Sequence, residues 1–209
     1  MIRWSPPPFD RVKINFDDSV WRNSAAGGFV IRTPNGNPLV AASSNFGITT
    51  ISVAEALSLR NSLICAKERG LSRVEVEGDS KLVIDAVNGI AASPWRILKL
   101  VQEIRCLRNS FDFISFKHIF RETNFVANAV ANVGHKVGDV RFWEECVPPE
   151  ASLALSFDYV NRDFVANAVA NVGHKVGDVR FWEECVPPEA SLAMSFDYVN
   201  RGCVRGTFI

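Results

Sequence analysis

The chain has 209 residues, with 23 Lys and Arg against 23 Asp and Glu, and 47% of its residues are hydrophobic. This ordinary globular composition excludes a disordered charged tail, a collagen-like chain and a disulfide miniprotein. No apolar run reaches the roughly 20 residues that span a bilayer, and the N-terminus lacks the apolar segment of a secretory signal. The five cysteines form no C-x-x-C pair, so we expect reduced thiols in an intracellular protein, nuclear or cytoplasmic and not secreted.

Charge is distributed unevenly along the chain. Residues 1–135 carry 16 basic and 12 acidic side chains, a balance of +4, while residues 136–209 carry 7 and 11, a balance of −4. The first part is therefore mildly suited to a polyanionic partner, and the second part is not.

The first fifty residues predict three antiparallel strands. Val12, Ile14 and Phe16 alternate with polar residues, which is the period of a strand with one buried face. A second strand is expected at 27–32 and a third at 39–46, joined by the turn residues TPNGNP.

Helical and strand patterns alternate through the next eighty residues. We expect a helix, a strand, two helices, a strand and a helix, over residues 52–69, 73–77, 81–87, 97–107, 111–119 and 124–133. The order βββ-α-β-α-α-β-α predicts an α/β fold with a five-stranded mixed sheet flanked by helices. The domain is expected at residues 4–135, and the stretch after the two prolines at 148 and 149 is expected to be irregular.

A near-perfect repeat occupies the remaining part of the chain. Residues 125–162 and 164–201 are identical except that Met194 replaces Leu155. Two copies are too few for a solenoid, which needs about three stacked units. We interpret the repeat as a recent tandem duplication or a gene-prediction artefact, within an extension over 136–209. The alternative is that both copies compete for one docking site.

Three acidic residues are expected to converge. Asp17 is placed at the end of the first strand, Glu55 in the first turn of the first long helix, and Asp79 at the end of the fourth strand. Adjacent strand ends and a crossing helix bring such groups together, and carboxylates are ligands that Mg²⁺ prefers. Each acid also has a local interpretation: Glu55 in a capping box, Asp79 as an N-cap, and Asp17 in a polar turn.

Four segments, in this order, resemble motifs of the ribonuclease H-like domains. They are VKINFDDSV, AEALSLRNSL, VEVEGDSKLVI and FKHIFRETNFVANAVANVGH. The segment WSPPP before the first strand is similar to the corresponding segment of the plant, retrotransposon-derived members. The resemblance covers about residues 4–135. It implies the ribonuclease H fold and metal-dependent hydrolysis of the RNA strand of an RNA–DNA hybrid.

The resemblance also implies four metal-binding catalytic positions, at Asp17, Glu55, Asp79 and Asn128. The family has Asp at the fourth position, and here both Asn128 and its repeat copy Asn167 are Asn. We therefore expect two Mg²⁺ or Mn²⁺ ions with the second site weakened, because an amide oxygen carries no charge. No small-molecule cofactor is expected.

Other departures concern the surroundings of the site. Asp18 replaces the usual Gly, and Arg121 replaces a loop His, which indicates altered turnover or a phosphate contact. Nucleic-acid contacts are predicted for Arg121, Asn15, Arg96 and Lys99. For Arg96 and Lys99, which are assigned to the amphipathic helix, the alternative is an ordinary solvent-exposed helix face.

Two functional interpretations stay open from the sequence. One is a hybrid ribonuclease with a degenerate metal site, and the other is an inactive nucleic-acid-binding module or degraded retrotransposon remnant. In both, the expected partner is an RNA–DNA hybrid or structured RNA, with no membrane. We expect a monomer, and the repeat offers a route to a dimer.

Overall fold

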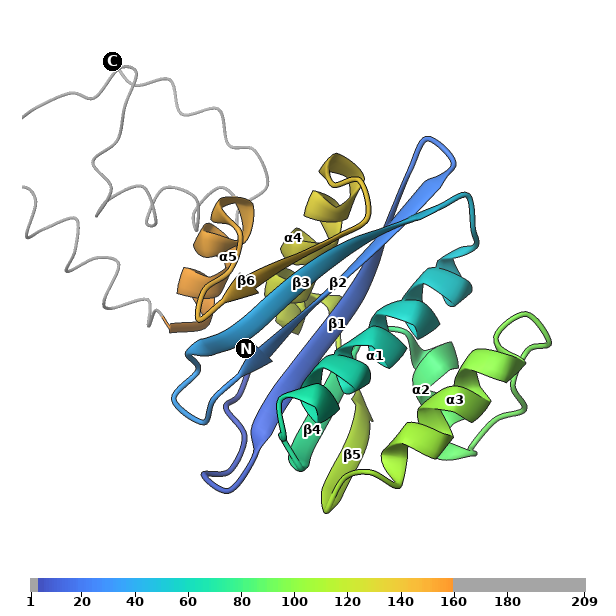
Figure 1. Cartoon of the computed structure of the whole chain (residues 1–209), viewed down its shortest axis with the longest axis horizontal. Coiled ribbons are helices and arrows are strands. Elements are labelled where there is room, and N and C mark those ends of the chain that lie inside the picture. Colours follow the sequence, from blue (N-terminus) through green and yellow to red (C-terminus); the bar gives the residue numbers. More distant parts are fainter. Residues whose placement is uncertain (1–3, 160–209) are drawn as a thin grey trace, which may run out of the picture. The chain divides into compact units, whose positions relative to one another are not determined.

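The computed structural model describes residues 4–159, which form one mixed sheet with helices on both faces (Figure 1). The strands are β1 (Val12–Trp21), β2 (Ser24–Arg32), β3 (Pro38–Gly47), β4 (Arg73–Gly78), β5 (Phe113–His118) and β6 (Val140–Glu144). The helices are α1 (Ile51–Glu68), α2 (Lys81–Asn88), α3 (Leu98–Arg108), α4 (Phe125–Val133) and α5 (Pro149–Tyr159), with short 3₁₀ turns at Arg121–Thr123 and Gly134–Lys136.

The strand order across the sheet is β5-β4-β1-β2-β3-β6. The pairs β1–β2 and β2–β3 are antiparallel, which confirms the predicted meander. The pairs β1–β4 and β4–β5 are parallel, as expected for strands joined by helical crossovers. The predicted mixed α/β architecture is therefore confirmed, and β1 lies inside the sheet with a neighbour on each side.

The first strand is longer than its alternating pattern indicated. Its pairing with β2 continues to Trp21 opposite Ser24, around a two-residue turn at Arg22 and Asn23. Both turn residues have positive φ, at 47° and 66°, as a tight hairpin turn requires. The prediction that Asp17 ends the strand was therefore wrong, because Asp17 lies in the strand opposite Gly28.

Two apolar clusters lie on opposite faces of the sheet. One contains Ile14 and Phe16 of β1 and is covered by α1, α2 and α3. The other contains Val30 and Ala41 and is covered by α4 and α5 (Figure 1). Because strand side chains alternate, Asp17 points to the face opposite Phe16, toward α4.

Two adjacent glycines allow helices to approach β2 closely from both sides. A Cβ at Gly28 would lie 2.5 Å from the backbone nitrogen of Ala131 in α4. A Cβ at Gly27 would collide with the Ser58 hydroxyl of α1. The pair therefore fixes how near α1 and α4 lie to the strand that pairs with Asp17.

The segment after residue 136 is more regular than predicted. The sheet has a sixth strand, because β6 pairs antiparallel with β3, and residues 149–159 form a helix where an irregular stretch was expected. Pro149 stands at the first helical position, where its missing N–H is no cost. Val147 and Ala151 complete the second apolar cluster, so burial stabilises structure that local sequence did not indicate.

A compact unit runs from Met1 to Leu155, so β6 and most of α5 belong to the same unit as the sheet. The division at residue 135 and the role of the duplicated extension stay predictions. Ser156–Ile209 forms a second unit, and the repeat copy at 164–201, with Asn167, lies outside the described residues. Across residues 4–159, no helix has the length and apolar character needed to cross a membrane.

Candidate metal centre

Three carboxylates from distant parts of the sequence meet at one point. Asp17 of β1, Glu55 of α1 and Asp79 just after β4 each place an oxygen within 4.8 Å of the others. Asp17 and Glu55 are only 3% and 4% exposed. The predicted convergence of these three acids is present in the structure.

The local interpretations of the three acids do not fit their positions. The N-cap of α1 is Thr50, so Glu55 lies beyond the first turn and closes no capping box. The N-cap of α2 is Ser80 and not Asp79. Asp17 lies in a strand and not in a turn. These acids therefore converge for a reason other than local capping.

One oxygen on each carboxylate is buried and has no hydrogen-bond partner: Asp17 Oδ2, Glu55 Oε2 and Asp79 Oδ1. A buried polar atom without a partner is costly, so such atoms usually mark a ligand site. Three hard oxygen donors of negative charge are the ligands that Mg²⁺ and Mn²⁺ take in proteins. The donor set thus fits a divalent cation.

The electrostatics of the cluster favour protonation when no cation is present. Burial, and then the nearby Asp79 carboxylate, raise the pKa of Asp17 to about 7. Burial, followed by the charges of Asp17, Asp18 and Asp79, raises the pKa of Glu55 well above its usual value. A cation would remove this repulsion, and its binding would release protons.

Asp18 belongs to the same cluster. Burial raises its pKa to about 6, while a hydrogen bond with Glu55 and the charge of Arg121 act in the opposite direction. Asp18 and Glu55 are thus close enough for each to affect the pKa of the other. Asp18, in the place of the usual Gly, adds a fourth carboxylate beside the three.

Asn128 lies on the first full turn of α4, and its side-chain amide is close enough to Asp17 to oppose the rise in the pKa of that carboxyl group. The structure thus brings the fourth predicted position to the acidic cluster. Asn132, one turn later, contacts both the side-chain and backbone oxygens of Asn128.

The four predicted nucleic-acid contacts lie in different surroundings. Arg121 is exposed in the 3₁₀ turn before α4, close enough to Asp18 for their charges to interact. Arg96 is exposed in the turn before α3, and Lys99 is exposed in the first turn of that helix. Asn15 is fully buried, so it has no surface available to a nucleic acid in this structure.

Asn15 belongs instead to a buried polar cluster. Its Oδ1 accepts hydrogen bonds of 2.9 Å from Trp4 and from Arg32, whose guanidinium lies 3.7 Å from the Trp4 ring centroid. Lys13 and Glu77 form a 2.6 Å ion pair beside it. This cluster attaches the N-terminal segment to the sheet, on the strand that carries Asp17.

Sequence reasoning missed several polar residues around the site. Asn124 donates a 2.8 Å hydrogen bond to the Phe16 carbonyl, and His118 Nε2 lies 3.1 Å from the Asp79 carbonyl. Ser19 donates to Asn132 across the gap between β1 and α4. The spacing of four between Asn124, Asn128 and Asn132 is the one signal that places them on a common helix face.

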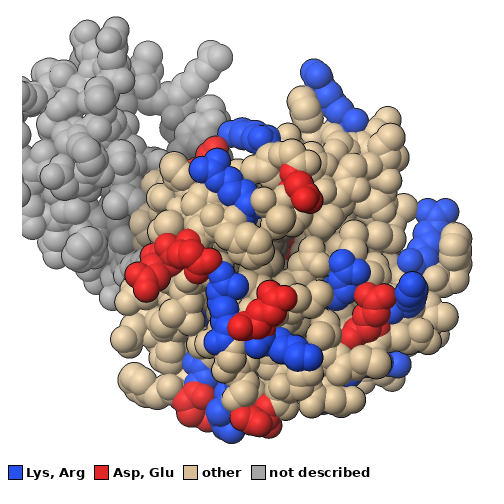
Figure 2. Space-filling model, in the orientation of Figure 1, with Lys and Arg blue, Asp and Glu red and all other residues tan. Residues whose placement is uncertain are grey.

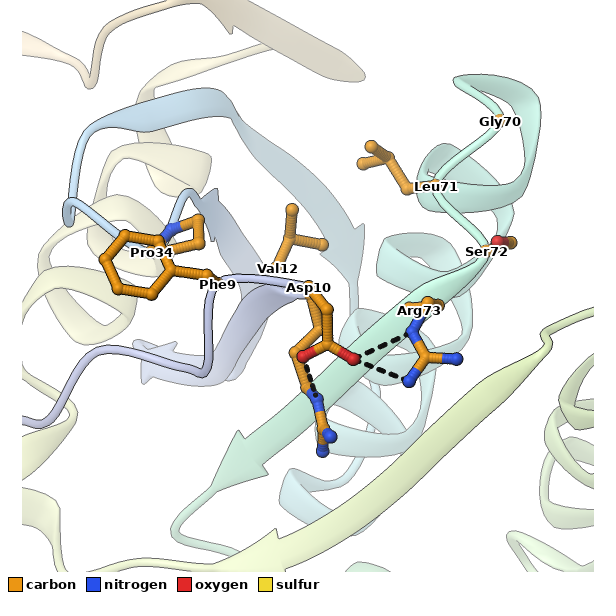
Figure 3. Close-up of a pocket in the computed structure, with 9 residues that line it drawn as sticks. Phe9, Asp10, Val12, Pro34, Gly70, Leu71, Ser72 and Arg73 are labelled. Atoms are coloured by element: carbon orange, nitrogen blue, oxygen red, sulfur yellow. Dashed lines mark hydrogen bonds and ion pairs between the residues drawn. The ribbon is translucent and has the colours of Figure 1, made fainter.

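A separate hollow of about 300 Å³ lies where β1 and β4 begin (Figure 3). Its one carboxylate, Asp10, accepts hydrogen bonds from Arg11 at 3.1 Å and Arg73 at 2.6 Å. Because two guanidinium groups already neutralise Asp10, this hollow does not offer a cation the ligands that the acidic cluster does.

Basic side chains do not form a continuous stripe on the face shown in Figure 2, as far as the described residues go. Lys and Arg alternate there with Asp and Glu. Any affinity for a polyanion from this face therefore depends on individual contacts and not on a broad positive field.

The chain is similar to proteins of one family. The family model described as reverse transcriptase-like matches residues 15–134. The solved ribonuclease H1 of the archaeon Halobacterium salinarum NRC-1 is 29% identical, with a TM-score of 0.58 over 60% of this chain and 98% of that one. The N-terminal ribonuclease H domain of a Mycobacterium tuberculosis protein is 28% identical, with a TM-score of 0.57 over 60% and 94%.

A third solved structure includes nucleic acid. LC11-RNase H1, in complex with RNA/DNA hybrid, is 27% identical, with a TM-score of 0.55 over 58% of this chain and 94% of that one. Comparison with curated proteins gives no match.

Proposed function

Because the chain belongs to the reverse transcriptase-like family and has the ribonuclease H fold, we propose that it hydrolyses the RNA strand of an RNA–DNA hybrid, using a divalent cation. The observation that carries the proposal is the convergence of Asp17, Glu55 and Asp79, each with a buried oxygen that has no partner. The relative solved with bound RNA/DNA hybrid supports the choice of substrate.

The three carboxylates would hold Mg²⁺ or Mn²⁺. Such an ion supplies an activated water and neutralises charge on a phosphodiester. Burial and the neighbouring carboxylates raise the pKa of both Asp18 and Glu55, so the metal-free cluster holds protons more tightly than free carboxyl groups do. Loss of these protons prepares the cluster for a cation.

Arg121 supplies a positive charge that acts on the Asp18 carboxyl group of the cluster. It is exposed, and it follows Phe120, whose side chain is 60% exposed. A guanidinium beside an exposed aromatic ring suits a phosphate and its neighbouring base or sugar. We expect the phosphate backbone of the hybrid to lie across this turn, with the scissile bond at the three acids. Arg96, in the turn before α3, and Lys99, in its first turn, would add a second phosphate contact.

The experiment is cleavage of an end-labelled RNA–DNA hybrid in Mg²⁺ and in Mn²⁺, with Asp17→Ala as the inactive variant. Asp139→Ala, which removes an exposed acid away from the cluster, is the matched control. We expect cutting by the wild type and the control, and at least 100-fold less by Asp17→Ala. Cutting that survives Asp17→Ala would show that another site acts.

Asn128 favours a second candidate function, a binding module without catalysis. An amide at the fourth position removes one negative charge from the site. This candidate predicts salt-dependent binding of the same hybrid by folded protein, without cleavage in either metal. Measuring binding and cleavage on one preparation separates the two functions.

A further inference from the structure

The orientation of the Asn128 amide decides what this side chain offers to a cation. One end of an amide is an oxygen acceptor, and the other is an NH₂ donor that repels a cation. The two ends look alike to most methods, so the hydrogen-bond network has to assign them. Here the neighbours of Asn128 leave one assignment.

The contacts of Asn132 show which end of its own amide is the NH₂ group. Its Nδ2 lies 3.0 Å from the backbone carbonyl of Asn128, and a carbonyl only accepts, so this end of Asn132 is its NH₂ group. The same Nδ2 lies 3.2 Å from the side-chain oxygen of Asn128. The Oδ1 of Asn128 therefore accepts from Asn132.

Two further residues hold Asn132 in this orientation. The Ser19 hydroxyl donates to Asn132 Oδ1 at 2.6 Å. Since the one hydroxyl proton of Ser19 is used there, its oxygen is left to accept from His135 Nε2 at 3.0 Å. The chain of donation runs from His135 through Ser19 and Asn132 to Asn128.

The oxygen end of Asn128 is thus engaged by Asn132, and the other end of the amide is an NH₂ group, which does not bind a cation. A cation that used the Asn128 oxygen would have to share or displace the hydrogen bond from Asn132.

We propose that the site takes a single divalent cation, held by Asp17, Glu55 and Asp79, and that Asn132, Ser19 and His135 are positioning residues that keep the Asn128 oxygen engaged by Asn132. This inference rests on the proposed metal-dependent function. The sequence analysis expects two ions with the second site weakened, whereas the inference is that only one ion binds. A carboxylate at position 128 would have no NH₂ group and would restore an acidic ligand.

The test counts Mn²⁺ bound to the full chain by electron paramagnetic resonance and calorimetry, with Mn²⁺ alone as the probe. We expect one ion for the wild type and two for Asn128→Asp, with dissociation constants within about tenfold of each other. Asn167→Asp makes the same change in the second repeat copy and is the matched control, expected to bind one ion. Circular dichroism melting confirms that each variant is folded.

Two ions on the wild type, or one on folded Asn128→Asp, would overturn the proposal, as would a gain of the second ion by Asn167→Asp. None of these ion counts decides whether the protein cleaves the hybrid. Cleavage is measured on the same preparations and tests the proposed function separately. No Mn²⁺ on folded wild type would overturn both.

The positioning role has its own readout. Asn132→Ala removes the donor to Asn128 Oδ1, so the amide can turn and present its oxygen. We expect a second, weaker Mn²⁺ site in this variant, and none in Asn171→Ala, the same change in the second copy. An unchanged count of one ion in Asn132→Ala would show that Asn132 does not orient Asn128.

Discussion

The side-chain NH₂ group of Asn124 donates a 2.8 Å hydrogen bond to the carbonyl oxygen of Phe16. Asn124 is the residue before α4, and Phe16 is the residue before Asp17. Asn124 is 1% exposed, so the bond is shielded from water. This one contact sets where the helix that carries Asn128 begins relative to the strand that carries Asp17.

Asn124→Asp tests that contact with almost no change of shape. The new carboxylate faces the Phe16 carbonyl and places a charge in a site shielded from water, so we expect a loss of about 1–3 kcal/mol in the free energy of unfolding at pH 8. Urea unfolding measures the loss. Asn109→Asp, at the exposed end of α3, is the control and should change stability little. Equal stability of the two variants would mean that the buried bond is dispensable.

Gly28→Ala tests the close approach of α4 to β2. The added methyl group would lie 2.5–2.8 Å from backbone atoms of Ala131 and Val130, which cannot turn aside as a side chain can. We expect a loss of about 1–3 kcal/mol in the free energy of unfolding. We also expect weaker hybrid cleavage, because Asn128 moves away from Asp17. Gly138→Ala is the control, since a Cβ there meets nothing within 4 Å. A melting temperature no lower than that of the control would contradict the packing.

The raised pKa of Asp17 predicts how stability depends on pH without metal. Its pKa rises from 3.8 to about 7 on folding, so the folded protein holds this proton more tightly. The resulting stabilisation is present below about pH 4 and is lost as the pH rises through 7. The side chain of Asp17→Asn cannot ionise. We therefore expect the free energy of unfolding of this variant to exceed that of the metal-free wild type by about 1–3 kcal/mol at pH 8.

Thermal melting from pH 4 to 8 in EDTA measures this difference, with Asp139→Asn as the control. Addition of Mg²⁺ should raise the melting temperature of the wild type at pH 8 and leave that of Asp17→Asn nearly unchanged. A wild type whose stability rises between pH 5 and 8 in EDTA would contradict the direction of the shift.

The duplicated segment predicts that either copy can complete the domain. Deleting residues 164–201 leaves the first copy, and deleting 125–163 joins Asn124 directly to the second copy. The two products differ within the repeat only by Leu155 or Met194, which is close to a volume-conserving exchange beside the second apolar cluster. We expect melting temperatures within about 2 °C of each other and equal cleavage. Failure of the second deletion alone would show that the copies are not interchangeable.

The sequence by itself determined five of the six strands of the sheet and the group of acids. Period-two alternation from Val12 to Asp17, turn residues between strands, and helical spacing after residue 52 are local signals, and each gave an element close to the observed one. Asp17, Glu55 and Asp79 could be grouped in advance because parallel strands joined by helical crossovers place their carboxyl ends at one edge of a sheet.

Only the tertiary structure decided the rest, because it depends on partners far away in the chain. The strand β6 and the helix α5 exist through pairing with β3 and burial against Val30, which no local pattern encodes. Asn15 is removed from the surface by Trp4 and Arg32. The sequence could place an amide at position 128, but the engagement of its oxygen depends on a hydrogen-bond chain that joins β1 to α4.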